Sequence, residues 1–307
     1  MASSLRLQKI ADELGITTLR HSGKDVYLLL LTRFIRMFAY GSSTLILALY
    51  FAALGHSDTK IGLFMTLTLV GDVAISLALT LIADSLGRRR ILILGALSMT
   101  FSGAIFATLS NYWILLLAAV VGVISPSGNE IGPFRAVEES TLAHLSKAET
   151  RSDVFAWYVI FGTLGTASGS LAAGWITQAL QGHGWSELGS FRFVFWLYAA
   201  IGLVKAGLSK LLSEACEAEP PKPKPAAQER ENGGEEQQPF LSNGQEQSSA
   251  PPPKKPTLAT LSNQSRITLT KLCGLFFFDS LASGMVPGSL VAYFVGLTFD
   301  LPCDLVD

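Results

Sequence analysis

Several polar and charged side chains lie within the most apolar stretches of the sequence, among them Arg36, Asp72, Asn129, Glu130 and Asp279. Ionisable groups are expensive to place in the hydrocarbon of a membrane, and where they occur they commonly bind solutes, ions or protons. We therefore interpret these residues as candidates for lining a substrate or proton pathway.

Asp72 lies near the middle of the apolar stretch 61–83. No basic residue lies within a helical turn of it, so any charged partner is on another segment. An unpaired carboxyl group at that depth would bind and release a proton near neutral pH, as a proton-coupled protein requires. The alternative is a neutral aspartic acid that is hydrogen-bonded among Thr66, Thr68 and Ser76.

Arg36 and Glu130 lie at similar depths in the first and fourth apolar stretches, differing by roughly 6 Å at the rise of an α-helix. Long side chains can cover that distance, so the sequence predicts an Arg36–Glu130 pair. The pair would face a cavity as a binding or proton-coupling element, or it would lock two helices together. The second reading stays open because pairing also lowers the cost of burying either charge.

The segment around Glu130 contains two prolines, Pro126 and Pro133, with Asn129 between them. Proline removes a backbone donor and interrupts a helix, and interruptions of this kind often line the solute path of membrane transport proteins. A plain helix kink is the alternative interpretation.

The elements that must position these residues are apolar segments, each long enough to span a bilayer. Hydrophobic residues make up 49% of the 307-residue chain and charged residues only 15%, which favours a membrane protein over two soluble domains. Within hydrocarbon the backbone must satisfy its own hydrogen bonds, so we predict an all-α, polytopic membrane helical bundle. The predicted helices are 26–54, 61–83, 91–109, 112–136, 154–180, 190–211 and 267–297.

Lysine and arginine are distributed unevenly between alternate gaps, and this bias places the N-terminus in the cytoplasm. We predict a multi-pass protein in which the segment 212–266 is a disordered cytoplasmic linker, because it is rich in proline and charge and has almost no apolar residue to bury. The other predicted parts are a cytoplasmic N-terminal segment 1–25, a six-helix bundle 26–211 and a seventh helix with a short outer tail, 267–307.

A short hairpin between the second and third predicted helices reads Thr-Leu-Ile-Ala-Asp-Ser-Leu-Gly-Arg-Arg-Arg over residues 80–90. It resembles the signature Gly-x-x-x-Asp-Arg-x-Gly-Arg-Arg of the major facilitator superfamily. Thr80 and Ser85 depart from the signature, and the matching positions are Asp84, Gly87, Arg88 and Arg89. The resemblance implies that the matching residues form a conformational gate at the inner mouth, with Arg135 as the natural partner of Asp84. The alternative is that the arginines only set the topology.

Small residues recur through the fifth predicted helix. The run 165–174 is similar to the antiporter signature Gly-x-x-x-Gly-Pro-x-x-Gly-Gly of the same family, with Gly165, Gly169 and Gly174 in matching positions. The resemblance implies export of a solute in exchange for protons. Glycines at this spacing also pack helices closely in any membrane protein, which is the alternative.

The layout of the whole chain is similar to the first half of a major facilitator protein, followed by the linker and one helix of the second half. The two six-helix halves of that family are parallel repeats. A shift of 243 positions aligns the first predicted helix with the seventh and places Asp279 opposite Arg36. The resemblance implies five further helices, so we expect this chain to be a truncated form or a half-sized relative.

We therefore expect a secondary transporter that moves a small organic solute through the lipid bilayer by alternating access, is coupled to protons, and favours efflux or antiport. The alternative is a non-transporting or inactive truncated membrane protein that acts as a receptor or assembly partner. We expect no enzymatic activity, cofactor or metal, because the sequence has no phosphate-binding glycine loop or metal-ligand cluster. A formal net charge of −1 gives no indication of nucleic-acid binding.

Overall fold

The computed structural model describes residues 15–122, 124, 133–217 and 288–299, together with 267–268, 270–271, 274–275 and 278. Side chains are described at these positions except at 76–86, 133, 288–289 and 296–299. The chain forms two compact units, residues 1–218 with 282–307 and residues 219–281. In the second unit the described residues all lie in helical stretches.

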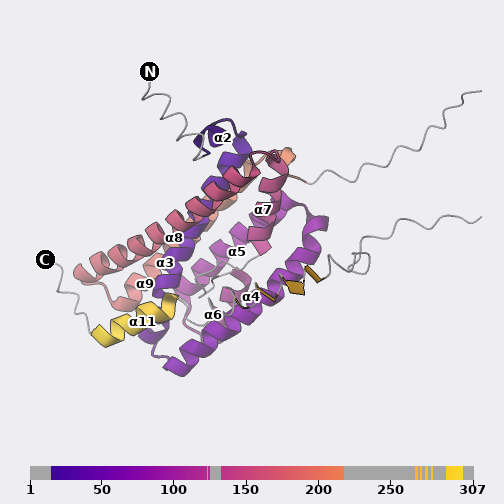
Figure 1. The fold of residues 1–307 in the computed structure, drawn as a ribbon. Coiled ribbons are helices and arrows are strands. Elements are labelled where there is room, and N and C mark those ends of the chain that lie inside the picture. The colour runs from indigo at the N-terminus through magenta and orange to yellow at the C-terminus, as the bar shows by residue number, and fades with distance from the viewer. Residues whose placement is uncertain are drawn as a thin grey trace, which may run out of the picture. The chain divides into compact units, whose positions relative to one another are not determined.

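The first unit is a bundle of α-helices (Figure 1). Among the described residues α3, α5, α8 and α9 are each long and apolar enough to cross a membrane, so the predicted all-α membrane bundle is confirmed. The elements are α2 (Ile16–Arg20), α3 (Lys24–Ala53), α4 (Asp58–Leu86), α5 (Arg88–Thr108), α6 (Tyr112–Gly122), α7 (Pro133–Leu145), α8 (Arg151–Gly182), α9 (Glu187–Lys210), the 3-10 turn η1 (Glu214–Cys216) and α11 (Gly288–Phe299).

The first, second, third, fifth and sixth predicted helices begin and end within three residues of α3, α4, α5, α8 and α9, and larger differences occur elsewhere. The fourth predicted helix ends at 136, whereas α7 continues to Leu145, because Glu138 is paired within the bundle rather than exposed at a helix end. The turn η1 lies inside the segment predicted as linker. It is ordered because Leu212 and Cys216 are buried beneath it, at 2% and 0% exposure.

The central helix of the first unit is α3, which contacts α4, α7, α8, α9 and α11. Its most extensive contact is with α8, and α5 packs extensively against α9. Figure 1 shows α3 and α8 side by side along much of their length. Any side chain that α7, α8 or α9 presents to α3 is therefore in the interior of the unit.

Glycines allow the backbones of α3 and α8 to touch. A Cβ atom at Gly165 would lie 2.6 Å from the carbonyl oxygen of Phe34, and one at Gly169 would collide with the carbonyl group of Phe38. Gly174 has ordinary space around it, since the nearest atom to a Cβ there would be 3.9 Å away. The packing interpretation of the glycine run therefore holds at Gly165 and Gly169, where no larger residue fits.

Two buried apolar clusters fill the first unit. One includes Leu29, Leu142 and Val154 and lies at the end that carries α2, the Gly87 turn and the turn before α8; we refer to this as the α2 end. The other cluster is rich in aromatic side chains and lies toward the opposite end. There the Tyr50 hydroxyl donates to the carbonyl oxygen of Phe106 at 2.8 Å.

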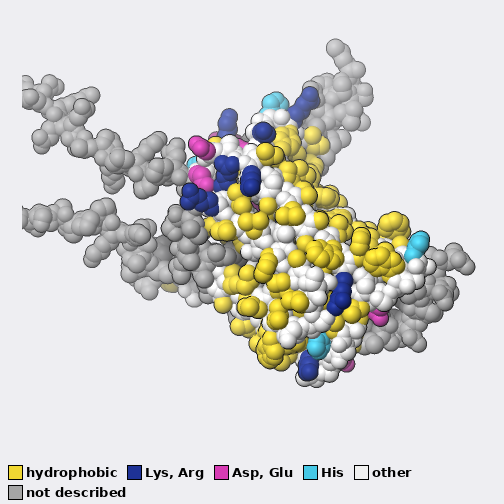
Figure 2. Space-filling view, turned by 180° about the vertical axis from the view of Figure 1, so that it is seen from behind, with side chains coloured by type: hydrophobic (Ala, Val, Ile, Leu, Met, Phe, Trp, Pro, Cys, Tyr) yellow, Lys and Arg dark blue, Asp and Glu magenta, His cyan; other side chains and the backbone are white. Residues whose placement is uncertain are grey.

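Apolar side chains cover the side of the bundle (Figure 2). Large exposed ones include Phe101, Trp113, Leu171 and Trp175, which are between 65% and 76% exposed. Figure 2 shows lysine and arginine gathered near the ends instead. An apolar belt between charged ends is the surface expected of a helix bundle that sits in lipid.

Candidate functional site

A buried carboxylate lies in the half of the bundle nearer the α2 end, where four helices meet. Glu138 of α7 is 1% exposed, and its Oε2 atom lies 2.5 Å from Nη2 of Arg36 on α3. The Tyr158 hydroxyl of α8 donates to the same oxygen at 2.9 Å. Nζ of Lys205 on α9 lies 3.4 Å from Oε1. We refer to Arg36, Glu138, Tyr158 and Lys205 as the Glu138 cluster.

Helical periodicity explains why these side chains meet. On α7 the residues Phe134, Glu138 and Leu142 follow one another at intervals of four and are all buried. On α8 the buried residues Val154 and Tyr158 have the same spacing. Residues four apart lie on one face of a helix, and both helices contact α3, from which Arg36 extends.

A second arginine stacks on the cluster. Arg33 is 5% exposed, and its Cζ atom lies 4.5 Å from the ring centroid of Tyr158. A Cβ atom at Gly162 would lie 2.9 Å from Arg33 Nε, so this glycine leaves room for the guanidinium group. The cation–π contact fixes the ring whose hydroxyl donates to Glu138.

Asp72 of α4 is connected to the same network. It is 3% exposed and interacts electrostatically with the hydroxyl of Tyr198 on α9, which also interacts with Arg36. The hydroxyls of Thr66 and Thr68 donate to backbone carbonyls of their own helix. Their oxygens can still accept a hydrogen bond from a neutral Asp72, so both interpretations of Asp72 stay predictions.

The predicted pathway residues fall into two groups. Arg36 is mostly buried and Asp72 is 3% exposed, and of the two Arg36 is the one in contact with Glu138. Asn129, Glu130 and Asp279 lie outside the described residues, so their roles and the Arg36–Glu130 pair stay predictions. The carboxylate that Arg36 contacts is Glu138, eight residues beyond Glu130 in the sequence.

The predicted gate is described only in part. Arg135 Nε lies 2.7 Å from Oε1 of Glu139, one turn further along α7, and both side chains are partly exposed. The side chain of Asp84 lies outside the described ones. An Asp84–Arg135 contact therefore stays a prediction.

Gly87 and the arginines after it are held by a carboxylate from the far end of α9. Glu217 accepts hydrogen bonds from the backbone N–H groups of Arg88 and Arg89 at 2.8 and 3.2 Å, which caps the start of α5. Gly87 has φ 86°, a left-handed conformation that favours glycine. A Cβ atom there would also lie 2.9 Å from Glu217 Oε2. The Arg89 guanidinium donates to the carbonyl oxygen of Lys210.

The segment 213–217 also attaches to α3. Asp25 accepts hydrogen bonds from the backbone N–H and the hydroxyl of Ser213, at 3.0 and 2.5 Å. Cys216 is fully buried between these attachments. Burial and the carboxylates of Asp25 and Glu217 raise the pKa of its thiol to about 11, so the thiol stays protonated at neutral pH. We refer to residues 213–217 as the 213–217 clamp, because it joins the ends of α3, α5 and α9.

Sequence reasoning missed Glu138, Tyr158, Lys205 and Glu217. Lys205 carried a usable signal, since a lysine five residues inside an apolar helix end is as unusual as Arg36. Glu138 lies just past the predicted end of the fourth helix, and Glu217 lies in a segment whose composition resembles a linker. Tyr158 carried no signal, because tyrosine is common in membrane helices.

The Glu138 cluster can do two kinds of chemistry. The carboxyl group of Glu138 can gain or lose a proton, and the side chains of Arg36 and Lys205 can pair with an anion. Within the described ranges no three His, Cys, Asp or Glu side chains lie close enough together to hold a metal ion.

Comparison with known proteins identifies relatives of the whole chain. The model of the Major Facilitator Superfamily matches residues 29–302. The uncharacterized membrane protein YJR124C of Saccharomyces cerevisiae is 35% identical over 280 residues, which are 91% of this chain and 62% of that protein. The chain thus spans just under two thirds of the length of this relative.

Glu138→Gln should leave Arg36 and Lys205 without their carboxylate. Breaking a buried ion pair from one side costs about 3–5 kcal/mol, so we expect the free energy of unfolding in detergent to fall by that order. Glu139→Gln is the matched control, because exposed pairs four residues apart on a helix contribute only about 0.3–0.5 kcal/mol. If both substitutions lowered the free energy of unfolding by the same small amount, the result would contradict a buried ion pair at Glu138.

Glu217→Ala should loosen the 213–217 clamp. Loss of a helix N-cap costs about 0.5–2 kcal/mol, which corresponds to roughly a 2- to 30-fold increase in the open population. Maleimide labelling of Cys216 measures that opening in a protein with Cys273→Ser and Cys303→Ser, and the labelling rate should rise by the same factor. Glu214→Ala, which removes an exposed carboxylate of η1, is the control. An unchanged rate in Glu217→Ala would show that the cap does not hold the clamp.

Proposed function

The chain belongs to the major facilitator superfamily, and from that membership we propose that it is a secondary transporter that moves a small organic solute across a membrane by alternating access. The observation that carries the proposal is the buried cluster of Arg36, Glu138 and Lys205, with the carboxyl group of Asp72 also buried in the same unit. Ionisable groups at membrane depth commonly lie on the path of a solute or ion.

Proton coupling is the second part of the proposal, and Asp72 and Glu138 are the carboxyl groups that would carry the protons. An ionised Glu138 pairs with Arg36 and Lys205, and a proton on its carboxyl group would release both cations. Arg36 and Lys205 would then be able to bind an anionic group of the solute, or the loss of the ion pairs would favour a different conformation of the helices. Proton binding and solute binding at one network are linked reciprocally, and this linkage is what drives solute movement with a proton gradient.

The family resemblance also assigns a direction and a gate. Efflux or antiport is favoured by the similarity of the run 165–174 to the antiporter signature. In the proposed cycle α3 and α8 move together, because their backbones touch at Gly165 and Gly169. We propose that the hairpin with Asp84 and Gly87, together with Arg135, closes the α2 end and that this end faces the cytoplasm, as the bias of lysine and arginine favours.

The transport proposal predicts that wild-type protein changes the distribution of at least one small organic solute between cells and medium. Metabolite profiles by mass spectrometry, taken from expressing and non-expressing yeast cells, would detect that solute. A protonophore should abolish the change. We expect Asp72→Asn to lower the proton-driven component at least about tenfold, the effect of losing about 1.4 kcal/mol of coupling.

Glu187→Gln is the control for this experiment, because Glu187 is an exposed carboxylate at the opposite end of the bundle. It should transport as the wild type does when both are expressed at equal levels in the membrane. Undiminished proton-driven transport by Asp72→Asn would rule out the role given to Asp72. A wild-type profile identical to that of non-expressing cells would contradict transport itself.

A further inference from the structure

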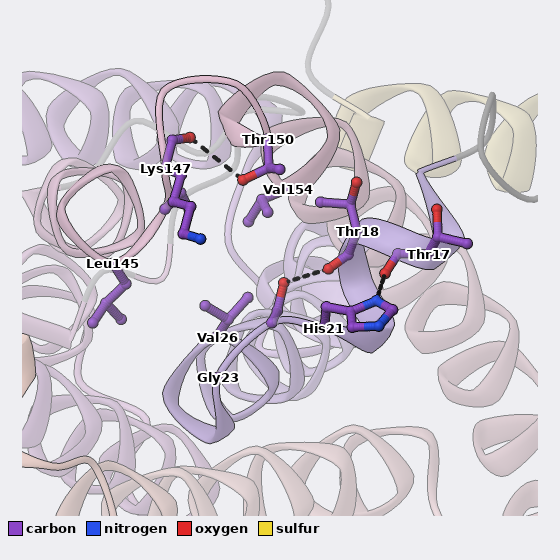
Figure 3. Close-up of a pocket in the computed structure, with 11 residues that line it drawn as sticks. Thr17, Thr18, His21, Gly23, Val26, Leu145, Lys147, Thr150 and Val154 are labelled. Atoms are coloured by element: carbon purple, nitrogen blue, oxygen red, sulfur yellow. Dashed lines mark hydrogen bonds between the residues drawn. The ribbon is translucent and has the colours of Figure 1, made fainter.

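A cavity of about 480 Å³ opens at the α2 end, away from the Glu138 cluster (Figure 3). It lies between α2, the first turn of α3 and the turn that joins α7 to α8. Its volume is within the range of about 300–1,000 Å³ that is typical of small-molecule sites. The lining residues are Thr17, Thr18, His21, Ser22, Gly23, Val26, Leu145, Ser146, Lys147, Thr150 and Val154.

The ionisable groups in this lining are cationic or can become so. Lys147 and His21 line the cavity, and no carboxylate does. Lys147 is exposed, and among the described residues it makes no ion pair. His21 Nδ1 lies 2.8 Å from the carbonyl oxygen of Thr17. That oxygen can only accept, so Nδ1 carries the proton, and a protonated ring would present Nε2–H as a further donor.

The hydroxyl groups of the cavity are already used as donors within the protein. Ser22 donates to the Thr18 carbonyl at 2.9 Å and Ser146 to the Leu142 carbonyl at 2.7 Å. The Thr18 hydroxyl donates to Asp153 at 2.8 Å, so that nearby carboxylate is also occupied. A phosphoryl group would therefore be held by Lys147 and His21, because these hydroxyl protons are not available to it.

The helices that begin here add to the positive potential. Gly23 precedes α3 and Thr150 precedes α8, and neither side chain caps its helix. Both residues line the cavity, so two long helices direct the positive ends of their dipoles toward it. The first turns of these helices also carry the carboxylates of Asp25 and Asp153, which accept hydrogen bonds from Ser213 and Thr18 and keep their negative charge.

The floor of the cavity is apolar. Val26 and Val154 are 3% and 2% exposed and belong to the buried cluster beneath, and Leu145 packs against it. A cavity with a cationic wall and an apolar floor suits an amphiphile better than a bare inorganic ion. Its place at an end of the apolar belt puts it at the level of lipid headgroups.

We propose that this cavity binds the phosphoryl headgroup of an anionic membrane phospholipid. Lys147 and His21 bind the phosphoryl oxygens at the wall of the cavity, and the apolar floor of Val26, Leu145 and Val154 lies beneath the headgroup. The inference rests on membrane insertion and not on the transport cycle. The cytoplasmic orientation proposed above agrees with it, because anionic lipids are enriched in the cytoplasmic leaflet.

The test measures binding to the purified full chain by native mass spectrometry and by thermal shift in detergent. The probes are dioleoyl phosphatidic acid, dioleoyl phosphatidylcholine and soluble glycerol 3-phosphate. Phosphatidic acid should bind at least about tenfold more tightly than the other two and raise the Tm. Lys147→Gln and His21→Gln should each weaken this binding several-fold, with a loss of about tenfold or more at Lys147, because it supplies a charge-assisted hydrogen bond.

Lys24→Gln is the matched control, since Lys24 is an exposed lysine directly after Gly23 that does not line the cavity. It should retain the affinity of the wild type for phosphatidic acid. If Lys24→Gln lost as much affinity for phosphatidic acid as Lys147→Gln, the binding would be a general attraction to the positively charged surface, and the proposal would be overturned. Equal affinity for glycerol 3-phosphate would assign the cavity to soluble phosphate esters and overturn the lipid as its ligand. The Tm without lipid must be the same in all variants, which separates binding from folding.

Discussion

The charge on Glu138 is the constraint on which the interior of the first unit depends. A buried carboxylate is tolerated only when cations and donors surround it, and here they come from α3, α8 and α9. Side chains from each of those helices must therefore reach Glu138 at one depth. The glycines of α8 meet that demand, because Gly162 leaves room for Arg33 and the next two glycines bring α8 onto the backbone of α3. The close packing of α8 against α3 and the pairing of the buried charges therefore depend on each other.

The same end of the bundle carries the other polar features. Asp72 is buried in the same unit, and the 213–217 clamp joins three helix ends below the cluster. In the proposed cycle the buried network is the part that changes its charge partners, and the clamp keeps the helix ends together while it does so. The cavity beside α2 lies outside both. In the proposed transporter the coupling groups would thus be separate from the proposed contact with lipid.

The sequence predicts the helices well because hydropathy reports burial in lipid or protein alike, and it finds Arg36 and Asp72 because a charge stands out in an apolar run. It fails at Glu138 because a run such as Phe134-Arg135-Ala136-Val137-Glu138-Glu139 has the hydropathy of a helix end. Only the three-dimensional arrangement shows that the first glutamate faces Arg36 while the second faces outward. Glu217 was missed for a similar reason, since composition marks the start of a linker but not a single capping residue.

A double-mutant cycle between Arg36→Gln and Glu138→Gln tests the account most directly. If the two side chains form the buried pair on which the interior depends, their effects on the free energy of unfolding in detergent will be strongly non-additive, with a coupling energy of about 2 kcal/mol or more. Once one partner is neutral, the second substitution will cost little further stability. Additivity to within about 0.5 kcal/mol would contradict the account, because it is the result expected of independent sites.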